Sequence, residues 1–180
     1  MTDAVADRAR SGAGEAQRAL YPVQGIDYTQ FVRVYLDVCC LKRPFDAQDQ
    51  VLVRLETEAV MTILSVPAGR IAHIRAPAHV LENSLNPLRW RREAVGAWLS
   101  RGPIAEFSEG PLTGRVDELI GLGFKSFDAL HLASAEAATA DAFLTVDGRL
   151  RKKAETLAAQ LHVRVTSPLV LVEEVFQWTT

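Results

Sequence analysis

Four acidic residues stand at positions where folding could bring them together. Asp37 and Asp147 each follow a short apolar run typical of a buried strand, VYL and FLTV. Asp128 falls near the start of an alanine-rich segment, and Glu82 lies in an earlier helix-like segment. In a parallel sheet the carboxyl ends of the strands border the ligand crevice. The spacing therefore predicts that all four carboxylates converge at one edge of a sheet.

Converging carboxylates repel one another unless a cation lies between them. Hard divalent ions such as Mg²⁺ and Mn²⁺ prefer oxygen ligands of this kind. An ion held this way activates water and neutralises charge on a reacting phosphate. Taken singly, each acid has a simpler explanation as a turn former (Asp37), a first-turn helix residue (Asp128), a solvated helix residue (Glu82) or a helix cap (Asp147). Only the set indicates a metal site.

The elements that must position these acids alternate along the chain. Strands are predicted over 31–38, 71–75, 104–107, 141–145 and 163–166. Helices are predicted over 47–66, 111–122, 126–140, 148–161 and 170–177, with two more that begin at Pro77 and Pro87. This alternation predicts a three-layer α/β fold, with a mostly parallel central sheet flanked by helices.

Local sequence patterns make the predictions for two of these helices more specific. The helix over 47–66 has an apolar stripe at spacings of three and four, formed by Leu52, Leu55, Ala59, Ile63 and Val66. In the helix over 126–140, Ser126 is the predicted N-cap, which would place Asp128 at the second helical position.

Composition limits the classes of protein to consider. The 180 residues fit one domain, predicted over 31–180, after a disordered or loosely ordered extension over 1–30. Lys and Arg total 20 and Asp and Glu total 22, so the net charge of −2 argues against binding nucleic acid by bulk charge. No apolar run reaches the roughly 18 residues of a membrane span. The N-terminus lacks a secretory signal pattern, so a cytoplasmic protein is expected.

The adjacent cysteines Cys39 and Cys40 are interpreted as two small buried residues in a reducing compartment. Neighbouring residues do not form an unstrained disulfide, and a lone pair offers no zinc-binding spacing.

Several segments together resemble a known family. They are VYLDVCCLKRPFD (34–46), HVLENSLNP (79–87) and FDALHLASAEAATADAFLTVD (127–147), followed by a basic helix. Together they resemble the PIN domain, the nuclease family that includes VapC-type toxins of type II toxin–antitoxin systems. The resemblance covers about residues 32–170, and its most specific part is D-A-L-H-L-A-x-A followed by F-L-T-x-D.

The resemblance implies a metal-dependent ribonuclease. It implies that Mg²⁺ or Mn²⁺ is held by the family's acids, which fall here on Asp37, Glu82, Asp128 and Asp147, and that a water attacks an RNA phosphate to leave a 5′-phosphate product. It also implies a cognate antitoxin protein as partner and a homodimer, with no membrane association. Glu58, on the polar side of the helix over 47–66, is the fallback for Glu82.

One departure from the family keeps a second interpretation open. Val38 and Cys39 stand where the family often has Thr or Ser and then Asn. The alternative is therefore a catalytically inactive PIN fold that binds RNA or a protein. A haloacid-dehalogenase-like phosphatase is a third class, but it would need an aspartate where Cys39 stands.

Basic and aromatic residues supply further candidates. Arg43, Arg149 and Lys152 are predicted to contact substrate phosphates, with a surface salt bridge as the alternative for Arg43. His131 shares a helix face with Asp128 and is interpreted as a hydrogen-bonded core histidine, with ordering of Asp128 as the alternative. The run Arg89, Arg91 and Arg92 could follow an RNA backbone or meet an acidic antitoxin, but a solvated helix face is the default. Trp98 and Trp178 are assigned to packing or an interface.

Overall fold

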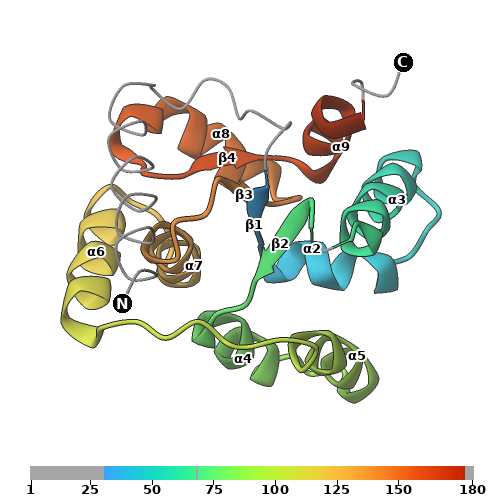
Figure 1. Cartoon of the computed structure of the whole chain (residues 1–180), viewed down its shortest axis with the longest axis horizontal. Coiled ribbons are helices and arrows are strands. Elements are labelled where there is room, and N and C mark those ends of the chain that lie inside the picture. Colours follow the sequence, from blue (N-terminus) through green and yellow to red (C-terminus); the bar gives the residue numbers. More distant parts are fainter. Residues whose placement is uncertain (1–30, 68, 177–180) are drawn as a thin grey trace, which may run out of the picture.

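A parallel sheet forms the centre of the computed structural model, which describes residues 31–67 and 69–176 (Figure 1). The strands of the described chain are β1 (Val32–Leu36), β2 (Ile71–Ile74), β3 (Ala142–Leu144) and β4 (Arg164–Thr166). Their order is β2-β1-β3-β4, and every neighbouring pair is parallel. The predicted extension over 1–30 and Trp178 lie outside the described residues.

Helices lie on both faces of this sheet. They are α2 (Val38–Lys42), α3 (Val51–Ser65), α4 (Pro77–Ser84), α5 (Arg89–Leu99), α6 (Glu109–Gly121), α7 (Ser126–Ala137), α8 (Gly148–Thr156) and α9 (Pro168–Phe176), with short 3-10 turns η1 (Arg43–Phe45) and η2 (Ala158–Gln160). Figure 1 shows α6, α7 and α8 on one side of the sheet and α3 and α9 on the other. The predicted α/β class, with a parallel sheet between helical layers, is confirmed.

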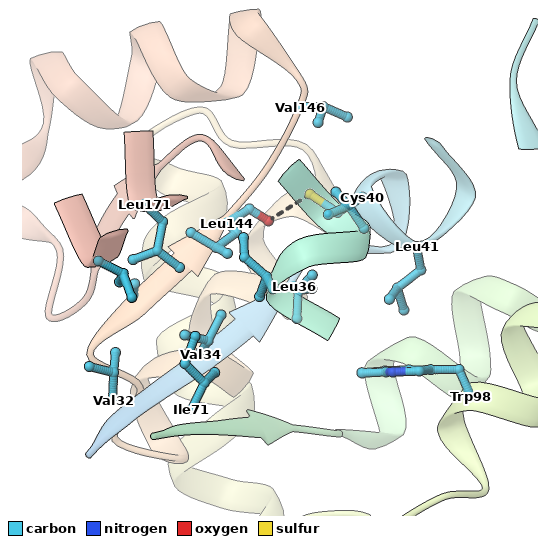
Figure 2. Packing of buried hydrophobic residues seen from close by; sticks show 14 of the residues in the cluster. Val32, Val34, Leu36, Cys40, Leu41, Ile71, Trp98, Leu144, Val146 and Leu171 are labelled. Carbon is cyan, nitrogen blue, oxygen red and sulfur yellow. Dashed lines mark hydrogen bonds between the residues drawn. The ribbon is translucent and has the colours of Figure 1, made fainter. Parts of the chain in front are cut away.

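Alternation along the central strand β1 divides the core in two. Val34 and Leu36 point into a cluster shared with α3, α5 and α9 (Figure 2). Tyr35, between them, points into the second cluster with α6, α7 and α8. All three side chains are fully buried, as expected of a central parallel strand covered on both faces. This burial fixes the register of β1 and therefore the position of the residue that follows it.

Two predictions about strands are wrong: the strand over 104–107 and the extension of the first strand to residue 38. Residues 104–107 form no strand. Within the described residues, a single backbone bond, from the Ala105 N–H to the Arg75 carbonyl, ties the segment to the chain just beyond β2. The chain after β1 turns at once into α2, which the sequence did not suggest. The VCCLK stretch is mostly apolar and too short to show helical periodicity, so the predicted strand over 31–38 runs into it at Val38.

The buried face of α3 also differs from the predicted stripe. The helix begins at Val51, and its buried residues are Glu56, Ala59, Val60 and Ile63. Leu52 and Leu55 are exposed instead. A different face of α3 is buried because Glu56 forms an ion pair with the Arg43 guanidinium. Arg43 Nε lies 3.0 Å from Glu56 Oε2. A buried carboxylate needs such a partner, and the predicted stripe took no account of it.

The two cysteines have different environments, and both thiols are free. Cys40 is fully buried, as predicted, and its thiol donates to the Leu144 carbonyl at 3.3 Å (Figure 2). Cys39 is only partly buried and makes polar contacts described below, so its interpretation as a buried apolar residue is wrong. Within the described residues, no helix has the length and apolar content needed to cross a membrane.

Candidate metal centre

The register of β1 and β3 brings two acids to the same sheet edge. Leu36 pairs with Leu144, and the Asp37 N–H donates to the Leu144 carbonyl at 2.8 Å. Asp37 therefore leaves the sheet directly after β1, and Asp147 follows β3 three residues after Leu144. Because the strands are parallel, both residues lie at the carboxyl edge, where ligands bind in open α/β sheets.

All four predicted acids line one cavity of about 490 Å³ at this edge. Each comes from a different part of the fold: Asp37 from the end of β1, Glu82 from α4, Asp128 from α7 and Asp147 from the start of α8. The cavity is completed by Cys39, Lys42, Leu85, Asn86, Pro87, Leu88, Arg91 and Phe127. Glu58, the fallback, is exposed on α3 and is not among the lining residues.

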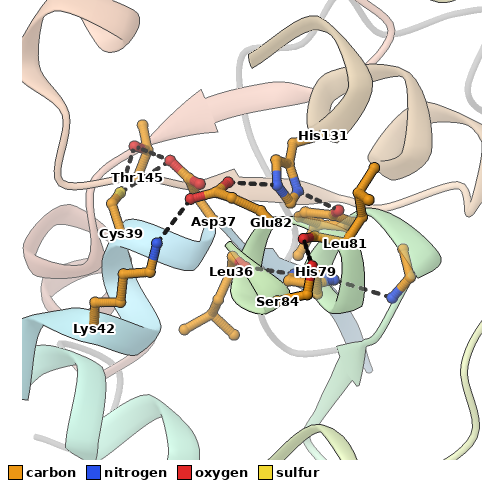
Figure 3. Close-up of polar contacts among 12 residues, drawn as sticks. Leu36, Asp37, Cys39, Lys42, His79, Leu81, Glu82, Ser84, His131 and Thr145 are labelled. Atoms are coloured by element: carbon orange, nitrogen blue, oxygen red, sulfur yellow. Dashed lines mark hydrogen bonds and ion pairs between the residues drawn. The ribbon is translucent and has the colours of Figure 1, made fainter. Parts of the chain in front are cut away.

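Asp37 is held in place by two side-chain donors (Figure 3). The Thr145 hydroxyl donates to Asp37 Oδ2 at 2.7 Å, and the Cys39 thiol donates to the same oxygen at 2.9 Å. Thr145 Oγ1 also accepts the Asp147 N–H at 3.1 Å. One hydroxyl thus links two acids of the site. Cys39, one of the two residues by which the sequence departs from the PIN-domain pattern, thus also donates to Asp37.

Glu82 is paired with two donors, one from α2 and one from α7 (Figure 3). Lys42 Nζ lies 2.9 Å from Oε1, and His131 Nε2 lies 2.9 Å from Oε2. Burial raises the pKa of Glu82, but the hydrogen bonds from His131 and Lys42 outweigh it and hold the pKa at about 2. Glu82 is therefore ionised at any physiological pH, as a metal ligand must be.

The partners of His131 assign its tautomer. An ionised Glu82 can only accept, so His131 Nε2 carries the proton of that bond. Nδ1 then accepts from the Tyr35 hydroxyl at 2.7 Å. Burial, with Asp37 nearby, raises the pKa of Tyr35 well above its ordinary value, which keeps the phenol protonated as this bond requires. His131 is a buried, hydrogen-bonded histidine, as interpreted, but the acid it orders is Glu82.

A second histidine attaches α4 to the end of β1. His79 Nδ1 accepts the Ala76 N–H at 3.0 Å, which caps the helix, and Nε2 lies 2.8 Å from the Leu36 carbonyl. Nε2 must therefore be the protonated nitrogen. Burial lowers the pKa of His79 to about 4, so the ring is neutral near pH 7. Because Glu82 is on the same helix, these bonds fix its distance from Asp37.

Asp128 shows how strongly the acids repel one another. Burial raises its pKa, and the charges of Asp37 and Asp147 raise it further. The N-cap of α7 is Lys125, with Ser126 as the first helical residue, so the predicted Ser126 cap is wrong. Asp128 nevertheless lies in the first helical turn and faces the cavity.

Asp147 has two roles that the sequence presented as alternatives. Its Oδ1 caps α8 by accepting the backbone N–H groups of Arg149, at 2.7 Å, and Leu150, at 3.2 Å. It also lines the cavity with the other acids. Capping uses one carboxylate oxygen, and a carboxylate has a second that can face a cation.

The donor set fits a divalent ion. Asp37, Glu82 and His131 each bring one ligand atom to within 4.8 Å of the others. The carboxylates suit Mg²⁺ and Mn²⁺, and the imidazole nitrogen is a ligand that Mn²⁺ accepts more readily than Mg²⁺. Since His131 already donates to Glu82, it is placed to orient that carboxylate, which is the usual role of a partner behind a metal ligand.

The predicted substrate-binding cations lie outside the lining of this cavity. Arg43 forms ion pairs with Asp46 at 3.1 Å and Glu56 at 3.0 Å. Arg149 and Lys152 are exposed on α8, beside Asp147. Their contact with substrate remains a prediction. The described cations that do line the cavity are Lys42 and Arg91.

Sequence reasoning missed Lys42 and Thr145 as parts of the site. Lys42 follows Asp37 by five residues, a spacing that indicates nothing until α2 is known to be a helix. Thr145 offered a weak signal, because it is the one hydroxyl in the apolar run AFLTV. Its buried position implies that the hydroxyl needs a partner, which is Asp37.

Comparisons with protein-family models, curated proteins and solved structures return no match to this chain.

Proposed function

We propose that this protein is a metal-dependent ribonuclease that hydrolyses phosphodiester bonds in RNA. The observation that supports it is the convergence of four acids, from four separate elements, on one cavity at the carboxyl edge of a parallel sheet. Such a concentration of negative charge destabilises a fold unless it serves to bind a cation. Phosphoryl chemistry is a reaction class that such a cation promotes.

The residues around the cavity have different roles in the proposed reaction. Asp37, fixed by Thr145 and Cys39, and Glu82, oriented by His131, would hold Mg²⁺ or Mn²⁺, with Asp128 and Asp147 completing the set. When bound, the ion supplies an activated water and neutralises charge on the phosphate. Lys42 is placed beside Glu82 to bind a phosphate oxygen once the ion takes over the charge of that carboxylate.

The biological role proposed with this activity is that of a toxin in a type II toxin–antitoxin pair. Its support is the PIN-like motif set around Asp37, Asp128 and Asp147. The same resemblance supports a cytoplasmic homodimer neutralised by an antitoxin protein. These proposals are separable from the chemistry, because cleavage of RNA can be measured without the partner.

One observation favours the second candidate, a non-catalytic binding module. Lys42 and His131 already compensate the charge of Glu82 without any ion. A site that keeps its shape through internal ion pairs can retain the fold and bind RNA or protein with no chemistry. The two candidates differ in what Mn²⁺ does to RNA.

The deciding experiment is cleavage of a mixed RNA pool by the full chain with Mn²⁺, Mg²⁺ or EDTA. We expect cleavage with the ions, none with EDTA, and loss of cleavage in Asp37→Asn. Glu58→Gln, an exposed acid outside the cavity, is the matched control and should cleave like the wild type. Wild-type protein that cuts no better than Asp37→Asn would leave the binding module as the function.

A further prediction concerns the residue that links two acids. Thr145→Val removes the hydroxyl donor to Asp37 at similar size, and loss of such a supporting bond costs about 10- to 100-fold in metal affinity. Calorimetric titration with Mn²⁺ measures it. Thr156→Val, on the exposed end of α8, is the control. Equal Mn²⁺ affinity in the two variants would contradict a supporting role for Thr145.

A further inference from the structure

The cavity has a second wall that the metal centre does not use. Besides the acids, the apolar residues Leu85, Pro87, Leu88 and Phe127 line the cavity. Leu85 is 63% exposed and Leu88 is 43% exposed, although both are apolar. This wall therefore combines a hydrophobic surface with direct access from solvent, next to a strongly charged site.

Phe127 is the aromatic residue of this wall. It directly precedes Asp128 in the first turn of α7, so its ring is fixed beside a proposed metal ligand. Among the described residues, neither of the two core clusters includes it. A partly buried phenylalanine that packs into no core, yet lines a polar cavity, has its ring face available to a ligand.

Asn86 adds an independent polar feature at the same wall. The side chain is 95% buried, with 5% exposed, and its Oδ1 accepts the Leu88 N–H at 3.2 Å. This bond fixes the orientation of the amide. Its Nδ2 has no hydrogen-bond partner in the described part of the chain. A buried donor left unpaired is costly, so a ligand that offers an acceptor there is favoured.

Two cations face the same cavity and complete its chemistry. Lys42 is paired with Glu82, and Arg91 is the other cation among the lining residues. The Arg91 side chain is 20% exposed, and its guanidinium lies 3.5 Å from Asp46 and donates to the Phe45 carbonyl at 3.2 Å. The cavity thus presents an apolar wall, an amide donor and positive charge within one space of about 490 Å³.

We infer that this wall is a subsite for one nucleotide of the RNA substrate next to the cleaved phosphate. The base lies against Phe127 and the two leucines, the Asn86 amide donates to an acceptor on the base edge, and Lys42 and Arg91 bind the backbone. The volume is within the range for a ligand of this size. The inference rests on the proposed function and adds to it the residues that select the nucleotide.

Binding can be tested apart from cleavage. The background is the full chain carrying Asp128→Asn, in EDTA, so that cleavage does not consume the probe. Fluorescence anisotropy measures binding of a short single-stranded oligoribonucleotide and of its duplex form. Phe127→Ala is expected to weaken binding of the single strand about tenfold, the scale of one lost stacked base, and Phe127→Tyr to restore it.

The matched control is Phe31→Ala, an exposed phenylalanine at the opposite end of β1 from Asp37. It should leave binding unchanged. Asn86→Ala is expected to reduce the difference in affinity among homopolymers of U, C, A and G, because the amide reads the base edge. A change in base preference is a readout that loss of packing alone does not produce.

Three results would overturn the inference: equal binding of the single strand by Phe127→Ala and its parent, equal losses for single strand and duplex, or loss only when Lys42 or Arg91 is changed. The last would assign the apolar wall to a protein partner instead. If base-dependent binding occurs but the wild type cleaves no RNA with Mn²⁺, the subsite stands and the nuclease proposal fails. If the wild type cleaves RNA but Phe127→Ala does not change binding, the nuclease proposal stands and the subsite fails.

Discussion

Asp128→Asn is expected to make the metal-free protein more stable while it removes RNA cleavage. Burial, together with the charges of Asp37 and Asp147, raises the pKa of Asp128. A carboxyl with a raised folded pKa is protonated more readily in the folded chain than in the unfolded one. Its cost to stability therefore appears as pH rises through the folded pKa. A neutral amide of the same shape removes that cost.

The same substitution removes a ligand that the proposed reaction needs. Cleavage should fall about a thousandfold, which corresponds to the several kcal/mol of charge stabilisation that a bound ion supplies. Two measurements test the pair of effects: the Tm in EDTA, expected to rise, and the cleavage rate with Mn²⁺, expected to collapse. The Tm increase that Mn²⁺ causes in the wild type should also shrink, because an ion that binds only the folded state stabilises it.

Glu58→Gln again serves as control, since it removes one acid far from the others. Its Tm and rate should match those of the wild type. A lower Tm for Asp128→Asn in EDTA would show that the carboxylate stabilises the fold and that the acids do not repel one another as their positions imply. Undiminished cleavage would exclude Asp128 from the reaction.

The architecture was predictable because its signals are periodic. The central strands β1 and β3 coincide with buried apolar runs, VYL before Asp37 and AFL before Thr145, whereas the edge strands β2 and β4 are only partly buried. The stretch IAEF has the same apolar alternation but joins no sheet. It follows Pro103, and in the described part of the chain its backbone bond beyond β2 is the one from Ala105 to Arg75, while Phe107 packs against the second core cluster. Local pattern cannot show whether a neighbouring strand is there to pair with.

The four acids of the site were predictable for a different reason. Their positions after β1 and β3, in the first turn of α7 and in the helix after β2 follow from topology, and the motif resemblance supported the choice of Glu82. Their supports were not predictable, because each depends on a contact between distant segments. Lys42 reaches Glu82 across 40 positions of sequence, and Thr145 reaches Asp37 across 108. No spacing within one segment indicates such a pair.

Beneath the acids lies a layer of buried aromatic side chains that the sequence did not indicate. Tyr35 stacks on His79, with ring centroids 4.4 Å apart, and on Phe143, at 5.4 Å. His131 meets Tyr35 edge-on at 5.8 Å. Within and around this layer the Tyr35 hydroxyl donates to His131 Nδ1, His131 Nε2 donates to Glu82, and His79 Nε2 donates to the Leu36 carbonyl. This packed aromatic layer holds β1 and α4 in place, so the carboxylates cannot move apart to relieve their charge repulsion.

His79 makes the stability of this aromatic layer sensitive to acid. The ring must stay neutral, because Nδ1 accepts the Ala76 N–H while Nε2 donates to Leu36. Burial lowers the pKa of His79 from 6.5 to about 4, so the unfolded chain binds a proton over this interval and the folded chain does not. The contribution to stability is complete above pH 6.5 and is lost as pH falls to about 4. It amounts to about 3 kcal/mol at the conversion of 1.36 kcal/mol per pKa unit.

Denaturant unfolding of wild type and His79→Gln across this interval tests the assignment. A glutamine at the third helical position can cap the Ala76 N–H as histidine does, but it does not titrate. Its unfolding free energy should therefore change much less between pH 6.5 and 4.5 than that of the wild type. Glu82 does not obscure the comparison, because a carboxyl held at about 2 loses its contribution only as pH falls below 4.5. Parallel pH profiles of the unfolding free energy for the two proteins would place the acid sensitivity at another residue. His79→Ala leaves two buried backbone groups unpaired, so it should be less stable at every pH by about 2–4 kcal/mol.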